Sequence, residues 1–146
     1  MRTLVLGLGN LLLADEGVGV HAAQALAQAG CPAHVTVLDI GTALFEALPE
    51  LERADRVVVV DAVQADGAPG SVYRIPMEDM ATKPCIASMH GFDLHRLLDM
   101  TRRRSPPEVV VVGVEPKRID WSLELSEPVR EAFPTVLETV RSEWNR

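Results

Sequence analysis

Two carboxylates and one imidazole are the side chains of this sequence best suited to chemistry. Glu16 follows the first apolar segment, Asp61 directly follows the apolar run 57–60, and His90 lies in a Ser-Met-His-Gly segment. Two carboxylates that converge on one crevice repel each other unless a proton or a cation lies between them. A neutral imidazole beside them completes a ligand set that suits nickel or zinc and leaves positions for other ligands. We therefore expect an open divalent-metal site at Glu16, Asp61 and His90.

Each of these residues, taken alone, also has an interpretation without chemistry. Glu16 is compatible with an acid in the first turn of a helix, Asp61 with a strand-end turn, and His90 with an exposed surface histidine. Asp15, beside Glu16, is interpreted as a helix cap. Glu115 is interpreted as a turn residue without contact to the metal. The site hypothesis therefore depends on the three predicted ligands meeting in space.

The elements that would position these residues follow an alternating pattern typical of an α/β fold with a largely parallel sheet. Strands are predicted over residues 3–8, 34–38, 56–60 and 108–112, and helices over 15–30, 43–53, 88–103 and 126–144, the last two with serine N-caps. Residues 71–75 follow a Gly/Pro-rich turn without a helical crossover, which predicts an antiparallel strand near an edge. In open α/β sheets ligands bind beyond the carboxyl ends of the strands, where Glu16 and Asp61 are expected.

A nucleotide-binding oxidoreductase is the alternative that the fold pattern favours. Gly7 and Gly9 follow a predicted strand and Asp39 ends the next one, which is a partial dinucleotide-binding fingerprint. The third glycine position is Leu12, however, and two acidic residues stand where a pyrophosphate would need free N–H groups. A non-catalytic metal-binding or carrier protein is the third hypothesis. Absorbance of a bound cofactor would identify the first alternative.

Composition limits the domain count and the partners. The 146 residues fit one domain over residues 1–146, and 14 Lys and Arg against 21 Asp and Glu give a net charge of -7. This charge disfavours nucleic acid and anionic membranes as partners. No apolar stretch approaches the roughly 20 residues of a membrane span, and the apolar start is interpreted as a first strand and not as a signal peptide. The basic run 102–104 is interpreted as a helix C-terminus.

The two cysteines indicate neither a zinc knuckle nor a disulfide framework. Cys31 and Cys85 are far apart in sequence and form no Cys-x-x-Cys pair. Cys85 lies five residues before His90 but has no identified activating partner, so a thiol protease is disfavoured. We expect a cytoplasmic monomer.

Five ordered motifs make the sequence resemble the hydrogenase maturation proteases over essentially its whole length. They are Gly7-Leu8-Gly9-Asn10 with Asp15-Glu16-Gly17-Val18-Gly19, Asp39-Ile40-Gly41-Thr42, the 57–60 strand ending in Asp61-Ala62, Ser88-Met89-His90 with Leu94, and Gly113-Val114-Glu115-Pro116. The resemblance implies a three-layer α/β/α sandwich around a five-stranded, mostly parallel mixed sheet with one antiparallel edge strand. That fold agrees with the antiparallel strand predicted at 71–75.

The resemblance also implies roles for individual residues. Glu16, Asp61 and His90 match the metal-binding and catalytic positions of the family, and Asp39, Gly41 and Thr42 match its substrate-recognition motif. Members of the family remove a C-terminal extension from the large-subunit precursor of a nickel-iron hydrogenase after nickel has been inserted. The implied activity is an endopeptidase of the aspartic or metal-recognising type.

The resemblance further implies that nickel is presented by the substrate. Nickel held by substrate cysteines would take Glu16, Asp61 and His90 as additional ligands and place the scissile bond beside the site. A Lewis-acid role and a purely templating role of the metal both fit these residues. Zinc or cadmium is expected to occupy the site in vitro. The implied partner is the large-subunit precursor.

Overall fold

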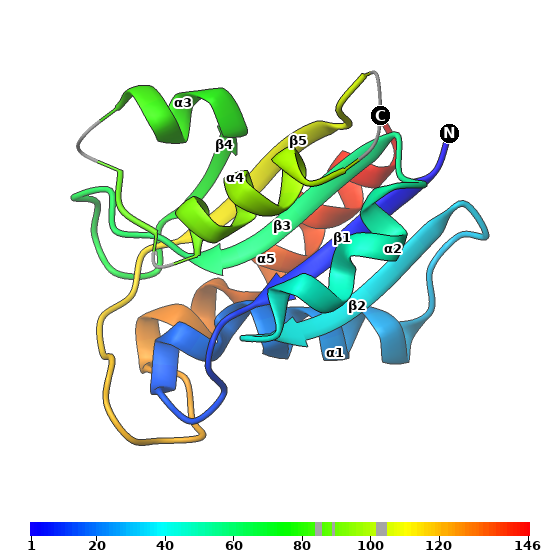
Figure 1. Ribbon diagram of the computed structural model, residues 1–146. Coiled ribbons are helices and arrows are strands. Elements are labelled where there is room, and N and C mark those ends of the chain that lie inside the picture. The colour runs from blue at the N-terminus through cyan, green and yellow to red at the C-terminus, as the bar shows by residue number, and fades with distance from the viewer. Residues whose placement is uncertain (84–85, 89, 102–104) are drawn as a thin grey trace.

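The computed structural model describes residues 1–83, 86–88, 90–101 and 105–146, which form a three-layer α/β/α arrangement (Figure 1). Its sheet has five strands in the order β2-β1-β3-β5-β4. The strands are β1 (Thr3–Leu8), β2 (Val35–Gly41), β3 (Arg56–Ala62), β4 (Val72–Pro76) and β5 (Glu108–Val114). Four strands are parallel, and β4 pairs antiparallel with β5 at the edge. The predicted fold class is confirmed, including the antiparallel edge strand.

Three strands extend beyond the predicted apolar runs at their carboxyl ends. The backbone ladder continues through polar and glycine positions, since Gly7 pairs with Asp39 and Asp61 pairs with Gly113. Hydropathy marks where a strand is buried, whereas the ladder ends only where the backbone stops pairing. The predicted functional carboxylates Asp39 and Asp61 consequently lie inside strands and not in the loops after them.

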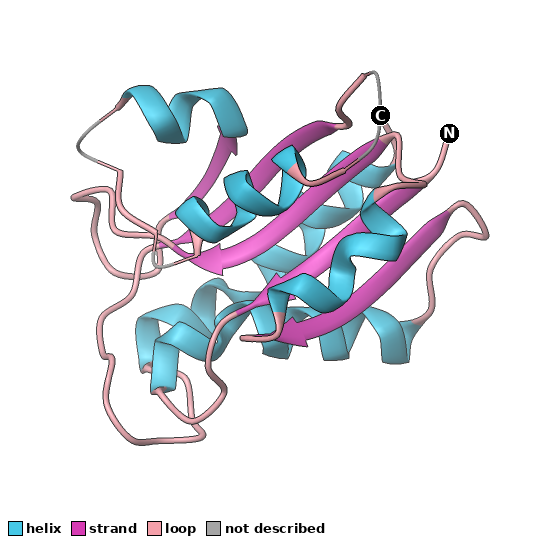
Figure 2. Ribbon diagram, in the orientation of Figure 1, coloured by secondary structure: helices cyan, strands magenta, loops and turns pink. Residues whose placement is uncertain are grey.

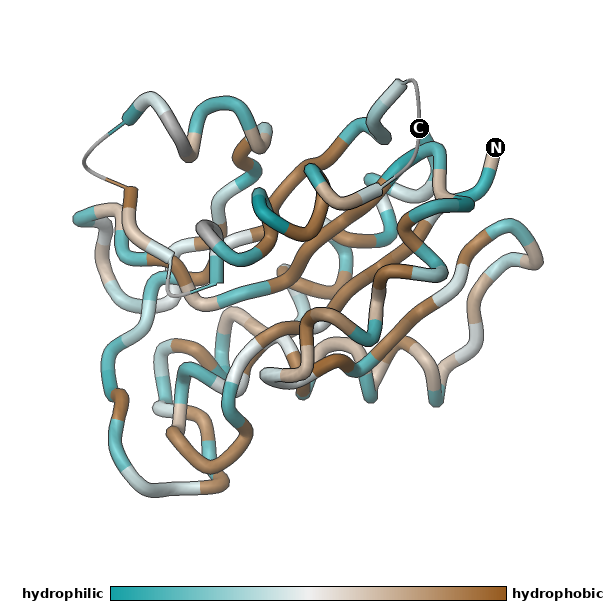
Figure 3. The backbone as a smooth tube through the Cα atoms, viewed as in Figure 1, coloured by the Kyte–Doolittle hydropathy of each residue, from teal (hydrophilic) through white to brown (hydrophobic). Residues whose placement is uncertain are grey.

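Helices cover both faces of the sheet and enclose two hydrophobic cores (Figure 2). On one face lie α1 (Val18–Ala29) and α5 (Glu127–Trp144); on the other lie α2 (Leu48–Leu51), α3 (Met77–Thr82) and α4 (Gly91–Asp99). The central strands are hydrophobic along most of their length because side chains of both orientations enter one core or the other (Figure 3). None of the described helices is long and apolar enough to cross a bilayer.

The helix boundaries differ from the predicted ones. The first helical segment begins as the 3₁₀ turn η1 (Ala14–Gly17) before α1, and the predicted helix 43–53 is the 3₁₀ turn η2 (Leu44–Ala47) followed by α2. Residues 102–104, predicted as a basic helix end, lie outside the described residues. The short helix α3 was not predicted, because six residues carry too little periodicity.

The two predicted serine caps have other partners. Ser88 does not begin α4, which starts at Gly91; its hydroxyl donates to Asp61 instead. Ser126 occupies the N-cap position of α5, but its hydroxyl donates to Asp15 and makes no capping bond. An ionised carboxylate is a strong hydrogen-bond acceptor. Each serine hydroxyl therefore turns toward the carboxylate and not toward the N–H groups of the helix. Both exceptions lie around the same edge of the sheet.

Close packing of α1 against the strands places η1 at the carboxyl edge. A Cβ atom at Gly19 would lie 2.1 Å from the carbonyl oxygen of Val60 and 2.3 Å from that of Leu8. Only glycine allows this approach of helix and strand backbones. The turn before α1, which carries Glu16, is therefore held directly above the ends of β1 and β3.

Candidate functional site

The predicted site residues converge where the strand order changes direction. The chain leaves β1 for its neighbour β2 on one side and later returns to β3 on the other. Such a switch point leaves a crevice beyond the carboxyl ends of the two strands. Glu16 enters it from η1, Asp61 from β3 and His90 from the N-cap of α4. The structure thus brings together the three residues predicted from sequence.

The His90 ring lies between the two carboxylates. Its Nδ1 is 3.1 Å from each carboxylate oxygen of Asp61, and its Nε2 is 3.4 Å from Glu16 Oε1. An ionised carboxylate only accepts hydrogen bonds, so the nitrogen that faces Asp61 carries the proton. In this tautomer Nε2 carries a lone pair, which can bind a proton or a metal ion together with Glu16.

Asp61 is fixed by two further hydrogen bonds. The Ser88 hydroxyl donates to Asp61 Oδ2 at 2.6 Å, and the Ala62 backbone N–H donates to Oδ1 at 2.9 Å. Ser88 Oγ also accepts from the His90 backbone N–H at 3.3 Å. Sequence reasoning missed this role of Ser88 and interpreted it as a helix cap; its spacing of two residues from His90 is the signal that points to it.

Burial and mutual charge shift the pKa values of the site. Burial raises the pKa of Glu16 above its ordinary value, and the Asp61 charge adds to this effect against the influence of His90 and of a backbone hydrogen bond. The hydrogen bond to Asp61 raises the pKa of His90, helped by the charges of Asp61 and Glu16 and opposed by burial. Glu16 and His90 therefore hold their protons more strongly than the isolated side chains would.

The separation of Glu16 and His90 suits a metal ion. Two ligand atoms at about 2.1 Å from a tetrahedral metal lie roughly 3.4 Å apart, the distance observed between Glu16 Oε1 and His90 Nε2. Asp61 lies on the other ring nitrogen, the position of a carboxylate that orients a metal-binding histidine. Within the described residues, no three His, Cys, Asp or Glu side chains surround one point as metal ligands. The role of Asp61 as a third direct ligand stays a prediction.

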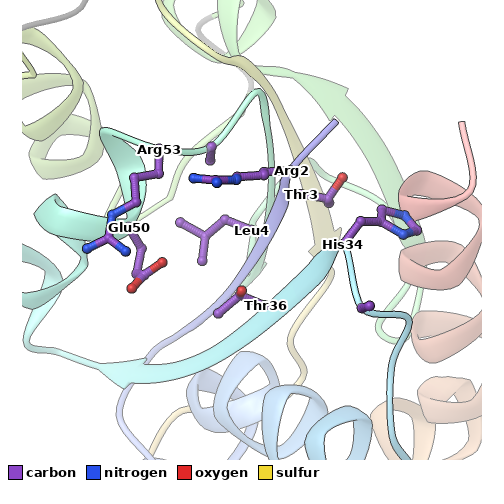
Figure 4. A pocket seen from close by; sticks show the side chains of 9 residues that line it. Arg2, Thr3, Leu4, His34, Thr36, Glu50 and Arg53 are labelled. Atoms are coloured by element: carbon purple, nitrogen blue, oxygen red, sulfur yellow. The ribbon is translucent and has the colours of Figure 1, made fainter.

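These residues line a pocket of about 210 Å³. Its other walls come from the loops after β3 and β5 and from the segment before α4: Ala62, Gln64, Ala87, Ser88, Pro116 and Ile119. A cavity of about 250 Å³ lies at the amino ends of β1 and β2 (Figure 4). There Arg2, Arg53, His34 and Glu50 line the wall, and Glu50 is the one carboxylate among the described lining residues, so we place the chemistry in the first pocket, where two carboxylates meet an imidazole.

The predicted substrate-recognition residues lie outside that pocket. Asp39 is exposed near the end of β2 and accepts a hydrogen bond from Gln24 Nε2 at 3.0 Å. Gly41 has a φ of 60° and accepts a hydrogen bond from Gly9 N–H at 3.0 Å, which ties this segment to the loop after β1. Thr42 follows immediately. We call these three residues the rim, and their recognition role stays a prediction.

Asp15 does not cap a helix as predicted, because η1 has no side-chain capping bond. Its buried carboxylate accepts four hydrogen bonds from the loop after β5: from the N–H groups of Lys117 and Arg118 at 2.9 Å each, and from the N–H and hydroxyl of Ser126 at 2.7 Å each. Asp15 therefore fastens the loop 115–126 beside the pocket. Its partners are more than 100 residues away in sequence, and no local pattern indicates them.

Glu115 contacts a neighbouring loop and not the predicted metal site. Its Oε1 accepts hydrogen bonds from Ala65 N–H at 2.8 Å, Gly67 N–H at 3.0 Å and the Tyr73 hydroxyl at 2.8 Å. These contacts agree with the interpretation of Glu115 as a strand-end turn residue. Cys85 lies outside the described residues.

Comparison with known proteins identifies the family. A model of the hydrogenase maturation protease family matches residues 20–143. The hydrogenase 2 maturation protease of Escherichia coli K12 is 34% identical over 145 residues, which cover 96% of this chain and 88% of that protein. The chain belongs to the hydrogenase maturation protease family. A putative hydrogenase maturation protease of Methanocaldococcus jannaschii is 30% identical, with 96% of this chain and 94% of that protein covered.

Solved structures of maturation proteases share the fold. The hydrogenase maturating endopeptidase HybD of E. coli superposes with a TM-score of 0.86 at 33% identity, covering 99% of this chain and 93% of that one. The [NiFe] hydrogenase maturation protease HybD of Thermococcus kodakarensis has a TM-score of 0.83 at 31% identity, covering 97% and 98%. The predicted family is confirmed, and the oxidoreductase and carrier hypotheses are set aside.

Proposed function

We propose that this maturation protease removes the C-terminal extension of a nickel-iron hydrogenase large-subunit precursor, using nickel held by the substrate as its recognition handle. The family membership supports an endopeptidase of hydrogenase maturation. The observation that carries the finer proposal is Glu16 Oε1 facing His90 Nε2 across 3.4 Å in an open pocket. Among the described residues, the two buried carboxylates have His90 as their shared ion-pair partner, and a substrate-bound metal ion would supply a further positive charge.

Each residue then has a distinct task. Glu16 and His90 Nε2 bind the metal that the precursor presents, and Asp61 takes part as a further ligand or holds the ring through Nδ1. Ser88 keeps the Asp61 carboxylate in place.

The remaining parts of the proposal concern partners and setting. The substrate is the large-subunit precursor; the net charge of -7 disfavours nucleic acid as a partner. Asp39, Gly41 and Thr42, on the rim, are proposed to select among precursors. The monomeric state and the cytoplasmic location stay predictions.

Mass spectrometry of a nickel-loaded precursor tests the proposal. Incubation with this protein should convert the precursor to one shorter product that has lost its C-terminal extension. Incubation with Glu16→Gln at the same concentration should leave it intact, while Glu138→Gln, at an exposed position of α5, serves as the matched control and should process it. Survival of the full-length precursor with the wild-type protein would contradict the proposed function.

A further inference from the structure

An exposed apolar surface borders the pocket. Four of the seven exposed large hydrophobic side chains among the described residues belong to two adjoining loops: Leu12 at 49% exposure, Ile119 at 43%, Trp121 at 76% and Leu123 at 61%. We call these four residues the apolar platform. Apolar side chains gathered in one place on a surface mark a binding site more often than scattered ones do.

Backbone pairing makes the platform continuous. The Ser122 N–H donates to the Leu12 carbonyl at 3.0 Å, and the Ala14 N–H donates to the Ser122 carbonyl at 2.8 Å. Leu13 and Ser122 form a parallel bridge, so their preceding neighbours Leu12 and Trp121 lie in chain segments that are paired directly beside them. The two loops run side by side at the lower left of Figure 1 and carry hydrophobic segments in Figure 3.

The platform is held rigidly although it is exposed. Asp15 fastens the loop at Lys117, Arg118 and Ser126 through four hydrogen bonds, and its own N–H donates to the Arg118 carbonyl at 3.1 Å. Ordering a loop before binding removes part of the entropy loss of association. A loop that is pinned by a buried carboxylate and yet leaves a tryptophan in water is built for contact with a partner.

The platform is continuous with the candidate active site. Ile119 lines the pocket together with Glu16, Asp61 and His90 and also belongs to the platform. The pocket of about 210 Å³ is smaller than the roughly 300–1,000 Å³ of sites that enclose drug-sized ligands. A polypeptide substrate that places one segment in this pocket must therefore make most of its contact outside it.

The exposed area of the platform distinguishes between two occupants, a second copy of this chain and the substrate of the pocket. Four partly exposed side chains offer on the order of a few hundred Å², less than the roughly 800 Å² per partner that a stable interface buries. The platform alone is too small to hold two copies of this chain together. Joined to the pocket, it supplies the missing contact area for a substrate that is anchored at the site.

We propose that the apolar platform docks the polypeptide substrate of the pocket, by contact with an apolar patch beside the segment that is cut, with Trp121 as the main anchor. This inference rests on the proposed function. Tryptophan is enriched among the residues that dominate interface energies. The adjacent charges Arg118 and Asp120 pair with each other at 2.7 Å, so the platform offers apolar contact and little net charge.

Steady-state kinetics on the nickel-loaded precursor test the proposal. Trp121→Ala should raise KM by at least roughly tenfold and leave kcat within about twofold, because the platform lies away from the reacting groups. Trp121→Phe should recover most of the loss, since it restores an apolar ring. Met100→Ala, at a residue 53% exposed at the end of α4, is the matched control and should leave KM unchanged.

The outcomes separate the inference from the proposed function. Processing by the wild-type protein with an unchanged KM for Trp121→Ala would overturn the platform and leave the function standing. A wild-type dimer in light scattering that Trp121→Ala converts to a monomer would assign the platform to a second copy of this chain and also overturn it. Absence of processing by the wild-type protein would overturn both. An unchanged melting temperature of Trp121→Ala is expected and shows that the KM effect is not unfolding.

Discussion

Two buried groups of charged side chains, one near each end of the sheet, differ in how their charges are balanced. Near the amino end of β3, Glu143 of α5 is 1% exposed and forms ion pairs with Arg56 and Arg74. Arg146 lies 3.5 Å from the same carboxylate, and Arg56 also pairs with Glu108 at 2.8 Å. Here every buried negative charge has at least one cation beside it.

At the carboxyl end, Glu16 is 3% exposed and Asp61 is 1% exposed, and the ion pairs they make in the described part of the chain are both with His90. The pKa values reflect the difference. Burial alone would raise the pKa of Glu143, but hydrogen bonds from Arg74 and Arg56 lower it, whereas the pKa of Glu16 is raised. The arginines beside Glu143 stay charged and stabilise the fold, whereas the two carboxylates at the carboxyl end share one histidine, an arrangement suited to receive a further cation from a partner.

Removal of the Glu143 carboxylate should have the largest effect, a loss in the free energy of unfolding. Glu143→Ala leaves the buried Arg56 and the partly exposed Arg74 without their shared acceptor, and breaking a buried pair in this way costs about 3–5 kcal/mol. Chemical denaturation monitored by circular dichroism measures the loss. Glu108→Gln is the control, because Glu108 is 63% exposed and its pair is expected to contribute only about 0–1 kcal/mol. Equal losses for the two variants would show that burial does not distinguish these pairs.

The stabilisation by Glu143 should depend on pH. Its pKa is lowered in the folded protein, so its contribution is present above the unfolded carboxyl value of about 4.3 and is lost as pH falls through the lower folded value. The groups that face it are Arg56, Arg74 and Arg146, which stay protonated, with Glu108 on the far side of Arg56. Denaturation of the wild type and Glu143→Gln should therefore give a difference that is constant near pH 7 and shrinks in acid. A difference that grows in acid would refute the assignment.

Substitution of Glu16 or Asp61, by contrast, should lower activity and leave stability unchanged. Asp61→Asn or Glu16→Gln should lower processing of the nickel-loaded precursor by at least roughly a hundredfold, because each removes a charge that is proposed to bind or orient the metal. Neither change should unfold the protein, since relieving repulsion between two buried carboxylates is neutral or stabilising. Parallel assays of tail release and melting temperature check both statements. Full activity of Asp61→Asn would refute the site assignment, and a collapse in stability would make the residue structural.

Substitution of Asp39, on the rim, should have the smallest effect on activity and stability. Asp39→Asn keeps an oxygen that can accept the hydrogen bond from Gln24, so the fold should be unchanged within about 0.5 kcal/mol. The exposed charge is lost, and the ratio of kcat/KM for two different precursors should shift by a few fold. A uniform loss on both precursors together with a lower melting temperature would indicate a structural role.

The central strands and the two site carboxylates could be predicted from the sequence, because local hydrophobic patterns mark their positions. The apolar runs 57–60 and 109–112 predicted central strands. Asp61, directly after the run 57–60, and Glu16, in the loop after the first strand, were predicted at one crevice, where the structure places them. Parallel strands bring their carboxyl ends to the same edge whatever the loops do, so these positions follow from strand order alone.

Interactions between distant segments could not be predicted. The partner of Asp15 at Ser126 is 111 residues away, and Ser88 donates to a carboxylate 27 residues earlier. Both serines have the local appearance of N-caps, and tertiary contacts overrode that preference. The same limit explains why the platform, which needs two loops to meet at Ser122, was not foreseen.

The central claim is that the site of Glu16, Asp61 and His90 acts on nickel held by the substrate and not on free metal held by the enzyme. The decisive measurement is tail release in two parallel reactions: nickel-free precursor with excess zinc, and nickel-loaded precursor with a chelator too weak to strip its buried metal. Two protein ligands facing each other across 3.4 Å bind free ions only modestly, so affinity must come from the metal that the precursor presents. Cleavage in the second reaction alone is the predicted result. Cleavage in the first reaction and none in the second would show a conventional metalloprotease and contradict the account.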